Sequence, residues 1–216
     1  MMLPRSNMRM ITFSFAALTL LSGACNEPGK QVVQADANAD QLYQLCTQCH
    51  GQQLEGNSEI AAPAVAGLPA WYVESQLEKF KAGVRGTHFD DIAGMRMRPM
   101  AMSLTAADIK TVAGKVADMA PHATPPLLDG DPARGKTLYA PCTACHGPVA
   151  AGNQQLSAPP LTQSPDWYLF TQLKNFKHGV RGANPKDITG AQMRPMAQGL
   201  ADEQAMRDVI AYIGTL

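Results

Sequence analysis

The sequence predicts an all-α fold built from two tandem copies of one small helical domain. Three observations lead to this prediction. The chain matches itself without a gap when it is shifted by 96 residues. Apolar residues recur at helical spacing, and no run of alternating apolar and polar residues indicates a strand. With 216 residues, 45% of them hydrophobic, the chain suits compact domains and not a disordered protein.

The two copies keep the same residues in their most distinctive segments. The shift superimposes the Cys-x-x-Cys-His motifs, a Trp-Tyr pair and the sequence MRPMA (46–50 with 142–146, 71–72 with 167–168, 97–101 with 193–197). Such fidelity indicates two copies of one domain, over residues 35–119 and 131–216. Residues 120–130 between them are rich in proline and are predicted to form a linker.

The first 24 residues have the layout of a secretory signal peptide. Arg5 and Arg9 give a positive start, residues 10–21 form an apolar segment without charge, and small residues follow. This apolar segment is too short to span a bilayer as a helix. We therefore expect residues 1–24 to direct export to the periplasm, with residues 25–34 as a short tether. A buried N-terminal helix is the alternative.

Cys25 is the one cysteine outside the repeated motifs. The preceding sequence resembles a bacterial lipobox, although Leu21 lies four residues before Cys25 and the usual pattern places it three before. A diacylated cysteine accounts for a single free thiol in an exported protein. We expect a lipoprotein-type signal and attachment to the membrane through lipidated Cys25, with an ordinary cleavage site as the alternative.

Each copy is predicted to contain three main helices. The first covers residues 39–51 and ends near Gly51, and the second begins near Pro69 and ends near Gly83. One face of the second helix is apolar in both copies (Val73, Leu77, Phe80 and Val84; Leu169, Leu173, Phe176 and Val180). The third follows Leu104, where Thr105 and Asp108 fit a capping box, and its counterpart runs from about residue 202 to the end.

The motif Cys-x-x-Cys-His indicates covalent attachment of c-type haem. It occurs as Cys46, Cys49 and His50, and again as Cys142, Cys145 and His146. On a helical turn both cysteines reach the vinyl groups of one porphyrin, and the histidine faces the iron as proximal ligand. A thioredoxin-like disulfide site would need a βαβ setting, and a zinc ribbon would need both cysteine pairs in one domain. The sequence therefore predicts two covalent haems c.

The second axial ligand of each iron is predicted to be a methionine. Two methionines recur in each copy: Met97 and Met100 in the first, Met193 and Met196 in the second. Met97 and Met193 each lie 47 residues after the motif histidine. Spacing alone leaves Met100 and Met196 open as alternatives.

The order of these elements resembles class I cytochrome c, and the tandem arrangement resembles the two-haem cytochrome c4 family, over residues 35–216. The resemblance implies two small helical domains, each folded around a covalent haem. It also implies that the axial methionine lies in a loop, seven residues before the leucine that opens the last helix. Leu104 and Leu200 then select Met97 and Met193.

Further recurring residues are candidates for supporting the haems. The resemblance implies a proline carbonyl behind each proximal histidine, from Pro63 in the first copy and from Pro159 or Pro160 in the second. Arg85 and Arg181 recur beside glycine, where a guanidinium suits a haem propionate, with a solvated charge at a helix end as the alternative. The recurring tryptophans are expected to pack against the haem (Trp71 and Trp167).

Ligation of both irons by histidine and methionine predicts an electron-transfer protein and not an enzyme, because both axial positions are filled. We expect a carrier of single electrons between a respiratory donor and a terminal oxidase or reductase. The alternatives are a haem subunit of a larger oxidase or dehydrogenase complex, which the segment WYxxxQLxxFxxGxRG also resembles, and a di-haem peroxidase. Basic and acidic residues number 18 each, so no basic stripe points to nucleic acid.

Overall fold

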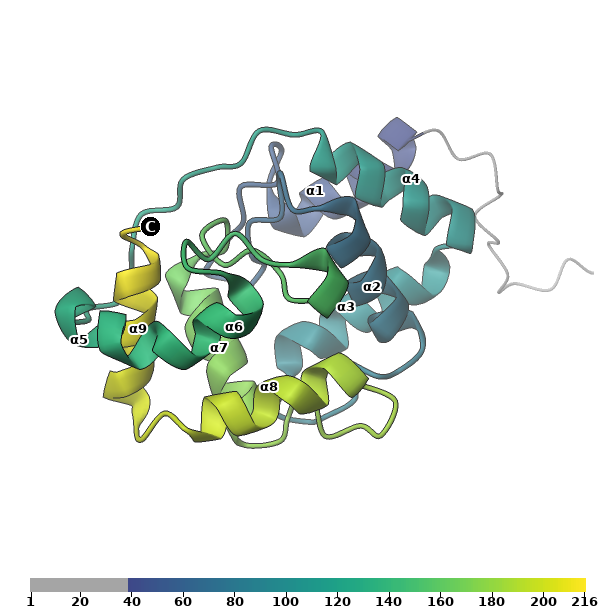
Figure 1. Ribbon diagram of the computed structural model, residues 1–216. Helices are drawn as coiled ribbons and strands as arrows, with labels where there is room; N and C mark the ends of the chain where they lie inside the picture. The colour runs from purple at the N-terminus through teal and green to yellow at the C-terminus, as the bar shows by residue number, and fades with distance from the viewer. Residues whose placement is uncertain (1–38) are drawn as a thin grey trace, which may run out of the picture. The chain divides into compact units, whose positions relative to one another are not determined.

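The computed structural model describes residues 39–216, which form helices joined by loops (Figure 1). The N-terminal copy contains α1 (Ala39–His50), α2 (Ala70–Lys81), α3 (Ile92–Ser103) and α4 (Ala106–Ala117). The C-terminal copy contains α5 (Pro132–Tyr139), α6 (Thr143–His146), α7 (Asp166–Lys177), α8 (Ile188–Gln198) and α9 (Glu203–Ile213). Extended pairing within residues 39–216 is limited to two isolated bridges, one per copy. The all-α prediction is confirmed.

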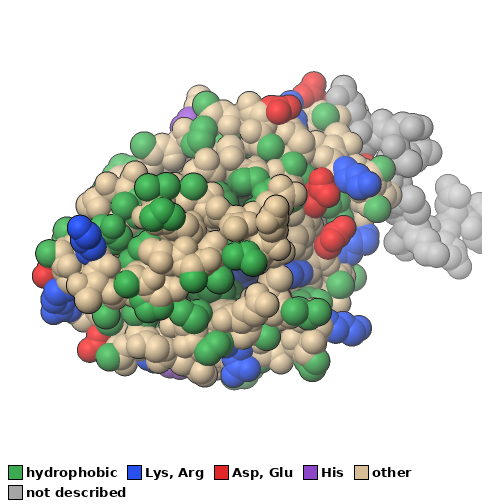
Figure 2. Space-filling model, in the orientation of Figure 1, with side chains coloured by type: hydrophobic (Ala, Val, Ile, Leu, Met, Phe, Trp, Pro, Cys, Tyr) green, Lys and Arg blue, Asp and Glu red, His purple; other side chains and the backbone are tan. Residues whose placement is uncertain are grey.

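The predicted signal peptide, the tether and Cys25 lie outside the described residues. Within residues 39–216, no helix combines the length and the apolar character needed to cross a bilayer. On the face shown in Figure 2, Lys, Arg, Asp and Glu side chains are scattered, with apolar side chains between them.

Short-range sequence signals determine where most helices begin and end. Thr105 and Asp108 form the predicted capping box: Asp108 N donates to Thr105 Oγ1 at 3.1 Å and Thr105 N donates to Asp108 Oδ2 at 2.8 Å. The second helix of each copy ends just before a glycine in the left-handed region, Gly83 at φ +68° and Gly179 at φ +75°. These boundaries agree with the predicted ones.

The predicted methionine loop is wrong, because the segment that carries Met97 is the helix α3 and its counterpart is α8. Asp91 and Asp187 cap these helices by accepting a hydrogen bond from the backbone N–H three residues on, at 3.0 Å in both copies. The Met, Arg and Ala residues that follow are good helix formers. The proline of the MRPMA sequence lies inside each helix, and capping and propensity outweigh it.

Each copy has a core of its own. In the N-terminal copy α1 packs against α4, and α2 packs against α3 and α4. In the C-terminal copy α5 crosses α9, and α7 packs against α8 and α9 (Figure 1). Leu77 and Phe80 are buried as the apolar rhythm of α2 predicts, whereas Val84 lies beyond the end of that helix. The helices of each copy thus pack around an apolar core of their own.

The linker is held against the C-terminal copy by a single carboxylate. Asp166, at the start of α7, accepts hydrogen bonds from Leu127 N at 2.6 Å and Leu128 N at 2.7 Å through Oδ2. Its other oxygen accepts from Trp167 N at 2.6 Å. The first copy has Ala70 at the position of Asp166, so this contact belongs to the second copy alone.

Candidate functional site

Each Cys-x-x-Cys-His segment forms a helical turn that exposes one cysteine and buries the histidine. In the first copy this turn is the end of α1, where Cys46 is half-buried, Cys49 is exposed and His50 is buried. In the second copy Cys142 is likewise half-buried, Cys145 is exposed and His146 is buried. None of these four cysteines forms a disulfide, so all four thiols are available for thioether formation.

Each motif histidine is fixed by a proline carbonyl. His50 Nδ1 lies 2.7 Å from the carbonyl oxygen of Pro63, and His146 Nδ1 lies 2.9 Å from that of Pro159, not of Pro160. Because a carbonyl only accepts, Nδ1 carries the proton and Nε2 keeps its lone pair for a metal. Burial lowers the pKa of both histidines, against a smaller opposite effect of the proline hydrogen bond. The neutral, metal-ligating form is therefore favoured.

A cavity lies beside the motif in the N-terminal copy. Cys46, Cys49 and His50 line one side of it. The other sides are mainly apolar and come from the loop after α1, from α2, α3 and α4, and from Tyr168 and Gln172 of the second copy (apolar lining: Leu54, Leu68, Leu77, Phe80, Val112 and Val116). A mainly apolar space with a nitrogen ligand and two thiols on one side suits a flat, apolar macrocycle bound through its edge and its metal.

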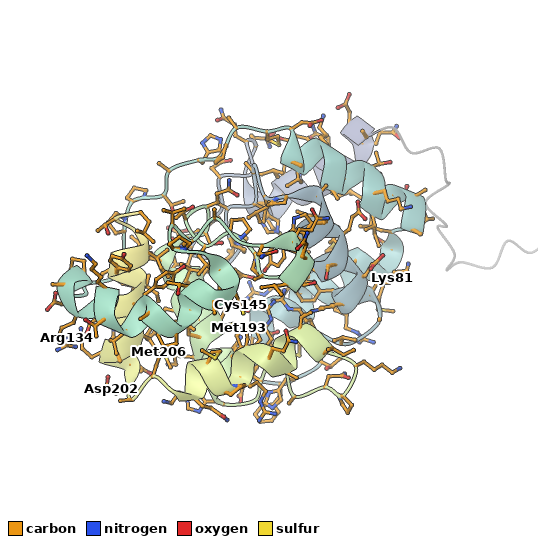
Figure 3. All side chains as sticks on the ribbon, viewed as in Figure 1. Lys81, Arg134, Cys145, Met193, Asp202 and Met206 are labelled. Carbon is orange, nitrogen blue, oxygen red and sulfur yellow. The ribbon has the colours of Figure 1, made fainter. Side chains whose placement is uncertain are left out.

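The recurring methionines differ in burial. Met97 and Met100 both line the cavity, but Met97 is half-buried against the core, whereas Met100 is 42% exposed. In the second copy Met193 is half-buried and Met196 is 40% exposed. Figure 3 labels Cys145 on α6 and Met193 on α8 of the C-terminal copy. Burial therefore favours Met97 and Met193 as the ligating pair.

Arg85 and Arg181 meet where the two copies contact each other. Each guanidinium donates to a glutamine of its own copy and to the matching glutamine of the other copy. The four bonds are Arg85 Nη1 to Gln76 Oε1 at 2.8 Å, Arg85 Nη2 to Gln172 Oε1 at 3.3 Å, Arg181 Nη1 to Gln172 Oε1 at 2.7 Å and Arg181 Nη2 to Gln76 Oε1 at 2.9 Å. The 96-residue shift exchanges the two halves, so the cluster repeats the symmetry of the sequence.

This arginine–glutamine cluster, Gln76, Arg85, Gln172 and Arg181, carries the positive charge of two guanidinium groups. Neither arginine forms an ion pair with a carboxylate within residues 39–216. The Nε atoms of Arg85 and Arg181 are buried without a hydrogen-bond partner. Burying a guanidinium beside neutral amides is costly. The orphaned donors therefore fit an anionic group at this place, such as the propionates of a haem.

The charge of this cluster also acts on the tyrosines around it. Burial raises the pKa of Tyr168, but the charges of Arg85 and Arg181 lower it by more, and the net direction is downward. Burial lowers the pKa of Arg181, whereas Tyr72, Tyr168 and Asp187 raise it by more, so Arg181 stays charged. The contact between the copies therefore contains two charged guanidinium groups next to Tyr72 and Tyr168.

The structure adds residues that the sequence analysis did not select. Tyr72 lines the cavity of the first copy, whereas the lining does not include Trp71. Trp71 and Trp167 are half-buried beside Tyr72 and Tyr168, in edge-to-face contact. The tyrosines, Gln76 and Gln172 all recur at the 96-residue shift, so the repeat contained a signal for them.

The chain is similar to known two-haem cytochromes. A sequence model of the family "Cytochrome c" matches residues 36–114 and 132–216. A "Thiosulfate dehydrogenase electron acceptor" of Stutzerimonas stutzeri is 28% identical over 209 residues, which cover 92% of each chain. The solved structure of a cytochrome c4 from Acidithiobacillus ferrooxidans superimposes with a TM-score of 0.65 at 26% identity, over 79% of this chain and 98% of that one.

A solved thiosulfate dehydrogenase from Marichromatium purpuratum also matches, with a TM-score of 0.62 at 31% identity. The match covers 79% of this chain but only 36% of that one, so this chain spans about a third of that protein. The double family match and the cytochrome c4 likeness agree with the two haem-attachment motifs and with the geometry around them. The chain therefore belongs to the cytochrome c family, as a di-haem protein of cytochrome c4 type that binds two covalent haems c and acts in electron transfer.

Proposed function

We propose that the protein is a periplasmic carrier of single electrons whose two haem irons are both ligated by histidine and methionine. His50 and Met97 would serve the first haem, and His146 and Met193 the second. The observations that support this proposal are that each copy contains a buried histidine fixed by a proline carbonyl and a half-buried recurring methionine, and that His50 and Met97 of the first copy line one cavity.

The bound haem supplies a one-electron Fe(II)/Fe(III) couple. The protein's residues supply the rest. Cys46 and Cys49, and likewise Cys142 and Cys145, anchor the macrocycle as thioethers. Histidine and methionine would together ligate the iron in each copy and would leave no coordination site for a substrate, and the soft thioether sulfur would favour Fe(II). This arrangement supports an electron-transfer role and not catalysis.

The arginine–glutamine cluster would bind haem propionates. Arg85 and Arg181 have buried Nε atoms without partners, and guanidinium binds carboxylates through two parallel hydrogen bonds. Because these arginines meet where the copies touch, each one lies within reach of groups from both copies. Pro63 and Pro159 would orient the histidines, and Trp71 and Trp167 contact the neighbouring Tyr72 and Tyr168 edge to face.

A dehydrogenase that oxidises thiosulfate is the donor that the relatives favour. The relative from Stutzerimonas stutzeri is named as the electron acceptor of such an enzyme and matches over 92% of both chains. A terminal oxidase or reductase would then take the electrons. A signal peptide over residues 1–24 would direct export to the periplasm. Lipidation of Cys25 would then attach the carrier to the membrane.

Spectroscopy tests the ligation. The oxidised protein should show the weak near-infrared band of methionine–iron bonding, with intensity for two haems. Met97→Ala and Met193→Ala should each remove half of it, and Met100→Ala and Met196→Ala should leave it unchanged. A full band in Met97→Ala together with a loss in Met100→Ala would overturn the assignment.

Stopped-flow reduction tests the donor. A purified thiosulfate dehydrogenase with thiosulfate should reduce both haems, and the dehydrogenase alone or thiosulfate alone should reduce neither. Hydrogen peroxide added to the half-reduced protein should not be turned over. Rapid peroxide turnover would favour the peroxidase alternative and contradict a pure carrier.

A fixed subunit of a larger complex is the second candidate. It is favoured by the match to about a third of the longer thiosulfate dehydrogenase chain. Size-exclusion chromatography of the protein from its native membrane decides between the two. A free carrier elutes by itself, whereas a subunit elutes with other chains in fixed stoichiometry.

A further inference from the structure

One ion pair between the copies breaks the symmetry of the repeat. Lys79, on α2 of the first copy, donates from Nζ to Asp187 Oδ1 at 2.7 Å and to Thr189 Oγ1 at 2.5 Å in the second copy. The side chain of Lys79 is 17% exposed and that of Asp187 is 1% exposed. A buried pair with two bonds from one ammonium group is shielded from solvent and salt, unlike a surface ion pair.

The mirror contact is absent because the sequence differs at two of the three positions. The 96-residue shift turns Lys79 into Asn175 and Thr189 into Ala93, while Asp187 corresponds to Asp91. Within residues 39–216 no lysine or arginine pairs with Asp91. Lys79 of the first copy therefore binds Asp187 of the second copy, and in the described part of the chain no equivalent ion pair joins the second copy to Asp91 of the first.

The contact acts on the helix that carries the proposed axial methionine. Asp187 is the N-cap of α8 and accepts from Gly190 N at 3.0 Å through the same oxygen that Lys79 binds. Lys79 on α2 of the first copy is thus hydrogen-bonded to the N-cap residue of α8, Asp187, and to Thr189 in the first turn of α8. Met193 follows on the next turns of α8. In the first copy, Asp91 caps α3 in the same way, but no lysine of the second copy is paired with it within residues 39–216.

We propose that Lys79 is a positioning residue that holds the Met193 helix, so that Met193 is displaced from its iron less readily than Met97. This inference rests on the proposed ligation by Met97 and Met193. The two haem sites would then differ in how readily their methionine is displaced, although both contain the Cys-x-x-Cys-His motif. The probe for this inequality is imidazole, which competes with a methionine ligand for ferric iron.

The test uses the full-length holoprotein with one methionine replaced, so that the near-infrared band reports a single haem. Met97→His leaves Met193 as the only source of the band, and Met193→His leaves Met97. Titration with imidazole should require a higher concentration to remove the band of Met193 than that of Met97. Adding Lys79→Asn to Met97→His should lower the half-point for Met193 by about threefold to tenfold, a size that corresponds to the net free energy of one ordinary hydrogen bond.

Three comparisons make the result specific. Lys110→Asn removes the same charge from an exposed position of α4 and should leave the half-point unchanged. Lys79→Asn in the Met193→His protein should not affect the band of Met97. Ala93→Thr with Asn175→Lys builds the mirror contact, and in the Met193→His protein it should raise the half-point for Met97.

The outcomes separate this inference from the proposed function. If both bands are present but Lys79→Asn does not change the half-point for Met193, Lys79 is not a positioning residue and the ligation stands. An equal change in both half-points, or the same change with Lys110→Asn, would also reject it. If the parent protein has no near-infrared band, the proposed ligation itself fails. The potential of the second haem, measured by spectroelectrochemistry, should fall on Lys79→Asn, because a loosened thioether stabilises Fe(II) less.

Discussion

The two copies reach the same histidine geometry from different backbones. In the first copy the haem-attachment motif ends a continuous helix of 12 residues, α1. In the second copy the equivalent stretch is α5, a 3₁₀ turn over Ala140–Cys142, and the short α6. Leu45 of the first copy corresponds to Pro141 of the second. Proline has no N–H to donate and its ring clashes with the preceding turn, so the helix breaks there.

The motif histidine is unaffected by this break. Its Nδ1 lies 2.7 Å from the proline carbonyl in one copy and 2.9 Å in the other. The residue after it is a glycine with positive φ in both copies, Gly51 at +85° and Gly147 at +79°. The last helical turn and the proline-bearing loop therefore determine the position of the histidine, and the helix before them is free to vary.

The largest effect is expected from removing the thioether anchors of one copy. Cys142→Ala with Cys145→Ala should lower the intact mass by one haem and unfold much of residues 131–216, because a domain this small needs the group that fills its core. Cys46→Ala with Cys49→Ala should do the same to the first copy. Mass spectrometry and circular dichroism measure both effects. Retention of both haems through an acidic acetone wash in the Cys142→Ala, Cys145→Ala protein would show that these cysteines are not the covalent anchors.

The repeat made much of this predictable from the sequence. The motif cysteines and histidines, the capping box at Thr105 and the ends of the second helices all rest on signals within a few residues. The Arg85–Gln172 bond and the Lys79–Asp187 pair join residues about a hundred positions apart. Such contacts depend on how two folded copies meet, which no local pattern encodes. The helical state of the Met97 segment was missed because the resemblance to class I cytochrome c implied a loop there, although Asp91 provides a local helix cap.

The next largest effect should come from giving the first copy the proline of the second. Leu45→Pro should destabilise the N-terminal copy by about 3 kcal/mol, because it removes a bond inside α1 and clashes with the preceding turn. Leu45 is 42% exposed but also lines the cavity of the first copy, so Leu45→Ala is the control for loss of the side chain without a break in the helix. The chain has two tryptophans, Trp71 and Trp167, one in each copy. Urea unfolding followed by Trp71 fluorescence in a Trp167→Phe background therefore reports the first copy.

A loss below about 1 kcal/mol on Leu45→Pro would show that the first copy tolerates the broken helix as the second does. The position of α1 would then depend on its contacts with α4 and on the bound haem, and not on its continuity.

A smaller, pH-dependent effect should distinguish the copies in acid. Asp208 of α9 is fully buried and corresponds to Val112 of the first copy. Burial raises the pKa of Asp208, but hydrogen bonds from Asp131 N and Gln204 and the charge of Arg134 lower it by more. Because the folded pKa lies below the unfolded one, the carboxylate stabilises the second copy at pH values above its ordinary pKa. That stability is lost as the pH falls through the folded pKa.

Asp208→Asn should therefore destabilise the second copy by about 2 kcal/mol at neutral pH and flatten its acid dependence. Trp167 fluorescence in a Trp71→Phe background measures this. Glu203→Gln removes a half-exposed carboxylate from the same helix and should change little. An acid transition that is as steep in Asp208→Asn as in the parent would assign the acid sensitivity to another group.

The smallest effect should come from giving the second copy the leucine of the first. Pro141→Leu restores an N–H that can donate to Thr137 O, which stabilises the folded copy by about 1 kcal/mol. It also raises the conformational entropy of the unfolded chain, which lowers the free energy of unfolding by about 0.4–1 kcal/mol. These terms nearly cancel, so the urea midpoint reported by Trp167 should barely move while amide exchange slows across residues 139–143. A stability loss above about 2 kcal/mol would contradict this balance, because it would mean that the second copy depends on the broken helix to present Cys142 and Cys145 to its haem.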